Sequence, residues 1–226
     1  MVKLTLKGRK YKLPERFTVD QWLQLVKFDY LNPHQWNKIM SIAIGVDESL
    51  LVDVDKESKI LAISLIINTM NARREYKVRD FNTITFGEFI DLDVYMVLGV
   101  EKNLKAIVTM LSEGTEWADE AMWLVDQYSL FRVHMYRSYA NLFGLNDQTE
   151  DDEEDDLESH DPNQIIKGWY KIIVDLANND ILKIDEVTDQ PLKKALNFMA
   201  YKKERQLEEN FKQLQQKRQY DLQRNR

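Results

Sequence analysis

The stretch "FTVDQWLQLVKFD" (residues 17–29) carries several independent marks of a helix start. Thr18 takes the N-cap position and Gln21 follows three residues later, which is the spacing of a capping box. Phe17 and Trp22 occupy the two positions of a hydrophobic staple around that box. The pattern therefore predicts a helix that begins directly after Thr18.

Similar helix boundaries recur along the whole chain. Thr85 and Glu88 form a second capping box, and both Asn32 and Asp161 stand directly before a proline at the first helical position. The predicted helices lie within residues 17–29, 32–45, 55–72, 83–99, 101–114, 116–143, 162–178 and 189–226. We expect the third of these to be central and buried, because apolar residues nearly surround it. We expect Thr188 to cap the last.

The N-terminal stretch "VKLTLKGRKYKLP" (residues 2–14) alternates apolar and polar residues, as a β-strand does. A two-residue turn at residues 8–9 would place Leu6 opposite Tyr11 and Leu4 opposite Leu13. The sequence thus predicts a β-hairpin, which needs the helices to pack against because a lone hairpin is marginally stable.

Composition agrees with a mainly helical protein and excludes some chemistry. The chain has 226 residues, 44% of them hydrophobic, and only 7 glycines and 4 prolines, which favours long helices over turn-rich β structure. No cysteine occurs, so thiol catalysis, disulfides and cysteine-ligated zinc are excluded. The 3 histidines are widely scattered and suggest no metal cluster. We predict no cofactor and no metal.

An acidic stretch, "QTEDDEEDDLESHDP" (residues 148–162), interrupts the helical pattern. Residues 147–161 hold ten acids and no Lys or Arg, so this part is −10 and the rest of the chain, whose total is −7, is −7 + 10 = +3. A run of like charges is typical of a solvated, flexible linker, while a metal site or an electrostatic contact with a basic partner are the alternatives. The spacing offers no calcium-ligand pattern.

The predicted architecture follows from these elements. We expect a mainly α protein with a hairpin and helical core domain at 1–145, an acidic flexible linker at 146–161, and a C-terminal helix pair at 162–226. The second helix of that pair ends in a long, charged, projecting tail.

No catalytic constellation is evident. Glu88, Asp91 and Asp93 could suggest paired carboxylates, but Glu88 already serves as a capping residue and no histidine or lysine lies nearby in sequence. His134 stands among aromatic residues and arginines at helical spacing, which is more typical of a structural histidine than of a catalyst. We therefore expect a protein that is not an enzyme.

The tail offers a candidate for partner binding. Leu207, Phe211 and Leu214 follow one another at spacings of four and three residues, one heptad step, and form a narrow apolar stripe. Residues 202–226 hold eight bases and four acids, a net +4, but the acids are interleaved with the bases. That interleaving makes nucleic acid an unlikely partner, because nucleic-acid binding needs a basic footprint. We predict that the stripe docks on another protein.

The order of parts resembles that of the small helical tail-assembly proteins of tailed bacteriophages, the tail assembly chaperone and baseplate-assembly class. The resemblance covers about residues 80–205 and rests on "ITFGEFIDLDVYM", "NLKAIVTMLSE", the acidic break and "WYKIIVDLANNDILKIDEVTDQPLKKALNFMAYKKERQ". A virion component of Bacteroidetes-type phages is a related resemblance. Neither supplies functional residues to carry over. Both imply contacts with other tail or virion proteins, or with further copies of this chain.

Three functions remain open at this point. The first is a phage tail or virion assembly protein, the second a stable structural or cargo component of the virion, and the third a nucleic-acid-associated regulator that uses the basic C-terminal helix. The N-terminus "MVKLTLKGRK" has no signal-peptide core, and the longest apolar run, "ILAISLII" at 60–67, is far short of the ~20 residues that span a bilayer. We expect no membrane partner, and a location in the host cytoplasm during assembly or in the virion.

Overall fold

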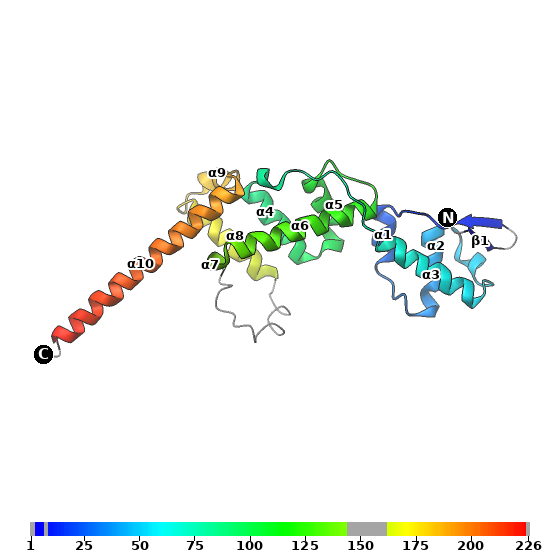
Figure 1. The fold of residues 1–226 in the computed structure, drawn as a ribbon, viewed down its shortest axis with the longest axis horizontal. Helices are drawn as coiled ribbons and strands as arrows, with labels where there is room; N and C mark the ends of the chain where they lie inside the picture. The colour runs from blue at the N-terminus through cyan, green and yellow to red at the C-terminus, as the bar shows by residue number, and fades with distance from the viewer. Residues whose placement is uncertain (1–2, 7–8, 144–161, 225–226) are drawn as a thin grey trace. The chain divides into compact units, whose positions relative to one another are not determined.

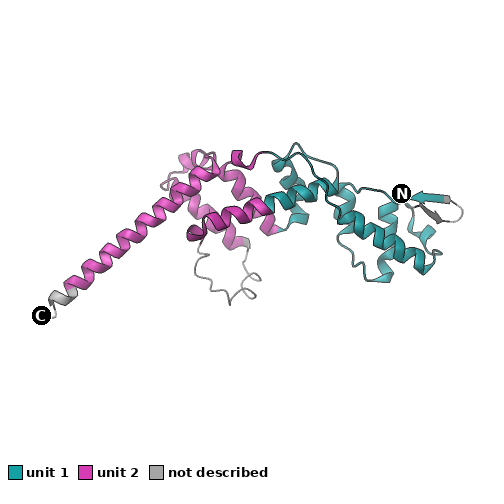
Figure 2. Cartoon of the chain, viewed as in Figure 1, with its two compact units in different colours: residues 1–79, 99–129 teal, residues 80–98, 130–226 magenta. Residues whose placement is uncertain are grey.

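The protein is mainly α-helical, as predicted. The computed structural model describes residues 3–6, 9–143 and 162–224 (Figure 1). The chain forms two compact units (Figure 2), of which unit 1 comprises Met1–Arg79 and Gly99–Ser129 and unit 2 comprises Asp80–Leu98 and Leu130–Arg226. The predicted acidic linker at 146–161 lies outside the described residues.

These units differ from the division at 145 and 162 that the acidic stretch suggested. Each unit is discontinuous in sequence, because residues 80–98 group with the C-terminal helices and residues 99–129 group with the N-terminal ones. A run of charge marks a break in helical pattern, but it does not tell which helices pack together. Packing depends on apolar faces that meet across long sequence separations.

The N-terminal hairpin of unit 1 is present, with a register that differs from the predicted one. β1 (Lys3–Leu6) and β2 (Arg9–Lys12) pair antiparallel with Leu4 opposite Tyr11 and Leu6 opposite Arg9. The connection is therefore residues 7–8 rather than 8–9. Gly8 belongs to the connection in either register, so the glycine alone does not fix the pairing. The shift moves each partner by two residues.

The helices of unit 1 begin and end largely where the sequence placed them. They are α1 (Val19–Leu25), η1 (Pro33–Gln35), α2 (Trp36–Ile44), η2 (Glu48–Leu51), α3 (Lys56–Met70), α5 (Val100–Leu111) and the first part of α6 (Ala118–Ser138). The capping box is confirmed, because the Thr18 hydroxyl accepts from the Gln21 amide at 3.2 Å and Gln21 Oε1 accepts from the Thr18 amide at 3.2 Å. Gly45 ends α2 at φ 72°, a conformation that favours glycine.

The prediction of a fully buried third helix was wrong. α3 buries Ala62, Ile63 and Ile66, whereas Ile60 and Leu61 are exposed on its other side. α3 packs on α2 and so needs only one apolar face. Apolar residues around a whole helix therefore overestimate its burial, because exposed single apolar side chains are common on protein surfaces.

Unit 2 is built around α4. Its elements are η3 (Phe81–Thr83), α4 (Phe86–Leu98), the end of α6, α7 (Ala140–Phe143), α8 (Pro162–Leu176), η4 (Ile181–Lys183), α9 (Ile184–Thr188) and α10 (Leu192–Arg224). α4 packs against α8, α9 and α10. The second capping box is confirmed, since the Glu88 amide donates to Thr85 Oγ1 at 3.2 Å and the Thr85 amide donates to Glu88 Oε2 at 2.9 Å.

The start of the last helix was predicted wrongly. Thr188 ends α9, where its hydroxyl donates to the carbonyl oxygens of Ile184 and Asp185 at 3.2 and 3.1 Å, so it does not cap α10. α10 begins after Pro191 instead. The residues between the last two predicted helices, 179–188, already contain η4 and α9.

In both units, backbone hydrogen bonds join the start of a capped helix to the start of a longer helix. In unit 1 the N-cap Thr18 pairs with Trp117, and Val19 N donates to the carbonyl oxygen of Glu116 at 2.8 Å. In unit 2 the N-cap Thr85 pairs with Pro191, and in the same way Phe86 N donates to Gln190 O at 2.8 Å and Leu192 N to Ile84 O at 3.1 Å. Each bridge fixes the starts of two helices side by side.

Close packing of α4 on α9 depends on Gly87. A Cβ at this position would lie 2.9 Å from Thr188 Cβ and 3.3 Å from its carbonyl oxygen, whereas a Cβ at Gly168 in α8 meets nothing within 4 Å. We therefore expect Gly87→Ala to destabilise unit 2 by about 1–3 kcal/mol through overpacking. The matched Gly168→Ala change should stabilise it by about 0.5–1 kcal/mol, because glycine is the poorer helix former.

Amide hydrogen exchange in α4 and α8 measures both effects as free energies of opening. Equal protection in the two variants would show that α9 can move away from α4 at little cost.

Candidate partner-binding helix

α10 has two parts with different surroundings. Its first part buries Leu192, Ala195, Leu196 and Met199 in unit 2. From residue 204 to residue 220 every side chain is exposed. The predicted site residues all lie in this second part, with exposed fractions of 60% for Leu207, 61% for Phe211 and 48% for Leu214. We call these three residues the stripe.

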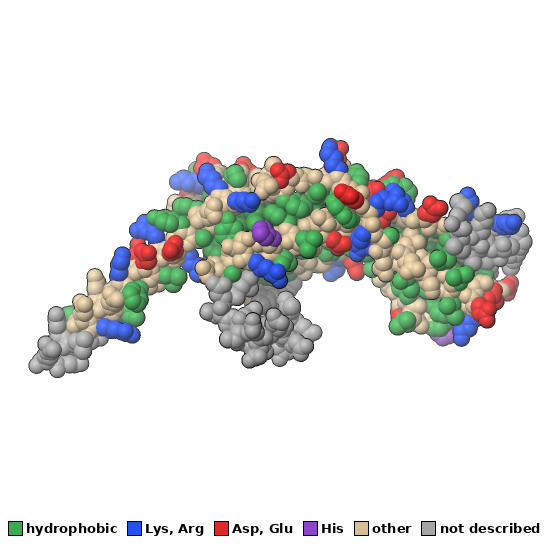
Figure 3. Space-filling model, viewed as in Figure 1, with side chains coloured by type: hydrophobic (Ala, Val, Ile, Leu, Met, Phe, Trp, Pro, Cys, Tyr) green, Lys and Arg blue, Asp and Glu red, His purple; other side chains and the backbone are tan. Residues whose placement is uncertain are grey.

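The stripe continues the face of α10 that is buried nearer its start. Leu207 and Leu214 follow Leu196 by 11 and 18 residues, which is close to three and five full turns of an α-helix. Phe211 lies one turn after Leu207. The same face of one helix is therefore covered by unit 2 up to about residue 203 and uncovered beyond it. Figure 3 shows hydrophobic side chains on the surface of α10 with charged side chains beside them.

Polar contacts hold α10 in place up to the point where the stripe begins. Asn197 Oδ1 accepts from the Tyr139 hydroxyl at 2.8 Å, and Lys202 Nζ binds Asp175 at 2.6 Å. Lys203 Nζ donates to the carbonyl oxygens of Asn141 and Leu142, at the end of α7. The stripe is thus presented from a fixed base.

Charges around the stripe are distributed unevenly. Lys217 and Arg218 follow Leu214 by three and four residues, which places them on its side of the helix. Glu208 precedes Phe211 by three residues and so lies beside it, whereas Glu209 follows Leu207 by two residues and points away from the stripe. Glu209 binds Arg205 one turn earlier at 3.1 Å. The C-terminal end of the stripe is consequently basic.

Of the three carboxylates considered for catalysis, Asp93 proves to be the centre of a buried network in unit 2. It is fully buried, its Oδ1 accepts from Arg132 Nε at 2.5 Å, and its Oδ2 accepts from Trp169 Nε1 at 2.9 Å. The Trp169 ring packs edge-on against Phe86 and Phe89, each with centroids 6.0 Å apart. Both carboxylate oxygens are thus used to join α4, α6 and α8.

Burial in unit 2 also shifts the pKa values of two residues near Asp93. Burial, together with the Asp93 charge, raises the pKa of Tyr136 above its ordinary value. Desolvation, with a smaller contribution from Glu88, raises the pKa of Asp91. Glu88 caps α4, and His134 is exposed on α6. The structure does not bring these side chains together into an acid–base pair.

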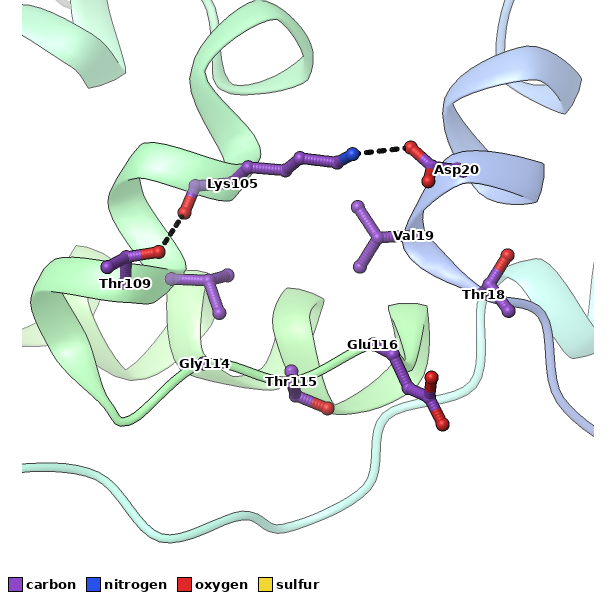
Figure 4. A pocket seen from close by; sticks show the side chains of 9 residues that line it. Thr18, Val19, Asp20, Lys105, Thr109, Gly114, Thr115 and Glu116 are labelled. Carbon is purple, nitrogen blue, oxygen red and sulfur yellow. Dashed lines mark hydrogen bonds and ion pairs between the residues drawn. The ribbon is translucent and has the colours of Figure 1, made fainter.

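An open cavity of about 390 Å³ lies in unit 1, between the start of α1 and the end of α5 (Figure 4). Its rim carries one ion pair, since Lys105 Nζ lies 2.7 Å from Asp20 Oδ1. The Thr109 hydroxyl donates to the Lys105 carbonyl oxygen at 2.9 Å. These polar groups satisfy one another, so the cavity does not indicate a ligand.

Within the described residues, no group of three or more His, Asp or Glu side chains is placed to hold a metal ion. No described helix combines the length and the apolar composition that a bilayer crossing requires. Comparisons of the chain with protein-family models, with curated proteins and with solved structures find no match.

Proposed function

We propose that this chain is a non-enzymatic assembly protein that binds other proteins through the stripe of α10, in the construction of a bacteriophage tail or virion. The observation that carries the proposal is the stripe itself. Three large apolar side chains stand in phase with the buried face of the same helix, yet they are 48–61% exposed. An amphipathic helix with such spacing is a common means of docking into an apolar groove.

The stripe is large enough to contribute measurably to binding. Full burial of a Leu or Phe side chain yields about 1.5–3 kcal/mol. Part of that gain is offset by the loss of rotational and side-chain freedom on association. Three such residues therefore support a contact that forms and releases, which suits a transient assembly factor. A permanent virion component would use the same stripe with additional surfaces.

The first test removes the tail. A chain that ends at Lys203 should keep its stability within about 0.5 kcal/mol, because the side chains of residues 204–220 are all exposed. Thermal melting followed by circular dichroism measures this. A large loss of stability would show that the tail belongs to the core of unit 2.

The functional arm of the test uses particles. Where the gene for this chain lies in a phage genome, the truncated chain and a Leu207→Glu chain should both reduce the yield of tailed particles seen by electron microscopy. Normal yields would reject the proposal. Mass spectrometry of purified particles then separates the two phage roles, since a structural component is present in many copies and a transient chaperone is absent.

The nucleic-acid alternative draws on the net +4 of residues 202–226. It requires binding to random duplex DNA that weakens steeply as salt rises. Absence of such binding at low salt rejects it.

A further inference from the structure

Unit 2 exposes a second apolar feature, at the turn between α8 and α9. Ile181 and Leu182 are 77% and 83% exposed, the two highest values among the large hydrophobic residues described in this unit. We call this pair the tip. Two adjacent apolar side chains so far out of the core suit a contact with another surface better than they suit packing within unit 2.

The backbone holds the tip outward in a fixed turn. Asn178 and Asn179 both adopt left-handed conformations, at φ 53° and 61°, which end α8. Asn179 N donates to the Val174 carbonyl oxygen at 2.9 Å. Asp180 then caps η4, because its Oδ1 accepts from the Leu182 amide at 3.1 Å. The tip is therefore a formed structure.

The segment that holds the tip is acidic, whereas the C-terminal end of the stripe is flanked by basic residues. Residues 180–189 contain four acids and one lysine, a net −3, and Asp185, Glu186 and Asp189 are all exposed. The stripe ends in Lys217 and Arg218 on its own face, with Glu204 as the acid at its other end. Opposite charges beside two apolar surfaces favour their encounter and fix its orientation.

We infer that the tip of one copy of this chain binds the stripe of a second copy. The stripe extends over seven residues, or about 10 Å along the helix, which matches a two-residue apolar tip. Both features are exposed within a single copy, so they do not cover each other there. The contact joins different surfaces, so each copy offers one tip and one stripe, and copies can add head to tail. The inference rests on the proposed use of the stripe for docking.

Parallel pairing of two stripes is less favourable than the tip contact, whereas antiparallel pairing would place Glu204 opposite Arg218 and is the rival that the Leu182→Glu variant tests. The heptad spacing places Glu204 before Leu207 and Arg218 after Leu214 at the next positions of the seam. In a parallel pair of copies each of these residues would face its own counterpart, and like charges would oppose each other at both ends. The tip offers apolar side chains without that repulsion.

The closing experiment uses two full-length variants, Leu182→Glu in the tip and Leu207→Glu in the stripe. Sedimentation velocity over a wide concentration range should show self-association of the unaltered chain. Each variant alone should self-associate at least about tenfold more weakly. An equimolar mixture of the two should recover a one-to-one complex, because one chain keeps its stripe and the other keeps its tip. Leu31→Glu, at an exposed leucine of unit 1, is the matched control and should leave self-association unchanged.

Charge reversal gives a second readout. The double change Lys217→Glu and Arg218→Glu should weaken self-association, and adding a chain with Asp185→Lys and Glu186→Lys should restore it. All altered side chains are exposed, so melting curves should stay unchanged.

Two results would overturn the inference. Full self-association of the Leu182→Glu chain on its own would show that stripes pair with stripes. A chain that stays monomeric at every concentration would show that another protein covers the stripe. In that second case, loss of tailed particles with the Leu207→Glu chain would leave the proposed function standing while this inference fails.

Discussion

Replacing Asp93 by alanine should destabilise unit 2 by about 3–5 kcal/mol, the usual cost of breaking a buried ion pair. The loss leaves the Arg132 guanidinium and the Trp169 indole N–H without the acceptor that now lies 2.5 and 2.9 Å away. Protein domains are stable by only about 5–15 kcal/mol, so this single change removes a large share of the free energy of unfolding. Asp93→Asn, which retains an acceptor oxygen but not the charge, should fall between the alanine variant and the unaltered chain.

A neighbouring surface pair provides the control. Asp175 binds Lys202 at 2.6 Å, but both side chains are largely exposed. Asp175→Ala should therefore cost less than about 1 kcal/mol. Thermal melting, together with amide hydrogen exchange in α4 and α8, measures the two changes side by side. Equal losses would mean that Asp93 contributes no more than a surface ion pair.

In unit 1 the corresponding loss is expected at Asp119. This carboxylate is buried and accepts three contacts from the Arg16 side chain, at 2.6, 2.9 and 3.0 Å, and it lies 3.4 Å from Arg74. Arg16 also stacks over the Trp117 ring at 4.6 Å. The contacts with Asp119, and to a lesser degree with Glu120, raise the pKa of Arg16. Asp119 therefore ties the segment before α1 to the start of α6.

We expect Asp119→Ala to destabilise unit 1 by about 1.5–3 kcal/mol, because it removes the main acceptor of the Arg16 guanidinium and leaves Glu120, 2.6 Å away, as its remaining carboxylate partner. Asp126→Ala, on the same helix, removes a more exposed partner of Arg73 at 2.7 Å and should cost less than about 1 kcal/mol. Hydrogen exchange in α1 and α2 reports the difference. Protection that is unchanged in the Asp119 variant would show that the capping box and the backbone bridge at Thr18 hold this segment on their own.

Local features of the fold could be predicted from sequence, and long-range ones could not. The capping boxes at Thr18 and Thr85 depend on residues three apart, and both formed as expected. Asp93 contacts residues that lie 39 and 76 positions away in the sequence, and no local sequence pattern predicts contacts over such separations. The buried contacts of Asp93 with Arg132 and Trp169 could therefore not be predicted from the sequence.

The candidate partner-binding surfaces likewise include one that could be predicted from the sequence and one that could not. The spacing of Leu207, Phe211 and Leu214 predicted a stripe on one helix face, because helical periodicity is a local property. The tip was missed, because Ile181 and Leu182 lie between the last two predicted helices, 162–178 and 189–226. Its only sequence mark is the pair Asn178 and Asn179, which tolerate the left-handed conformations of that turn. Exposure of Ile181 and Leu182 depends on how the turn is oriented against α8 and α9, which the sequence alone does not reveal.

The discontinuous make-up of the two units governs the order in which a growing chain can fold. Synthesis proceeds from the N-terminus, yet unit 1 lacks its last segment until Ser129 has been made. Residues 80–98 emerge still earlier and must wait for the C-terminal helices of unit 2. The Thr18–Trp117 and Thr85–Pro191 bridges can close only after those delays. No single cut of the chain between residues 80 and 129 would therefore leave either unit complete on one fragment.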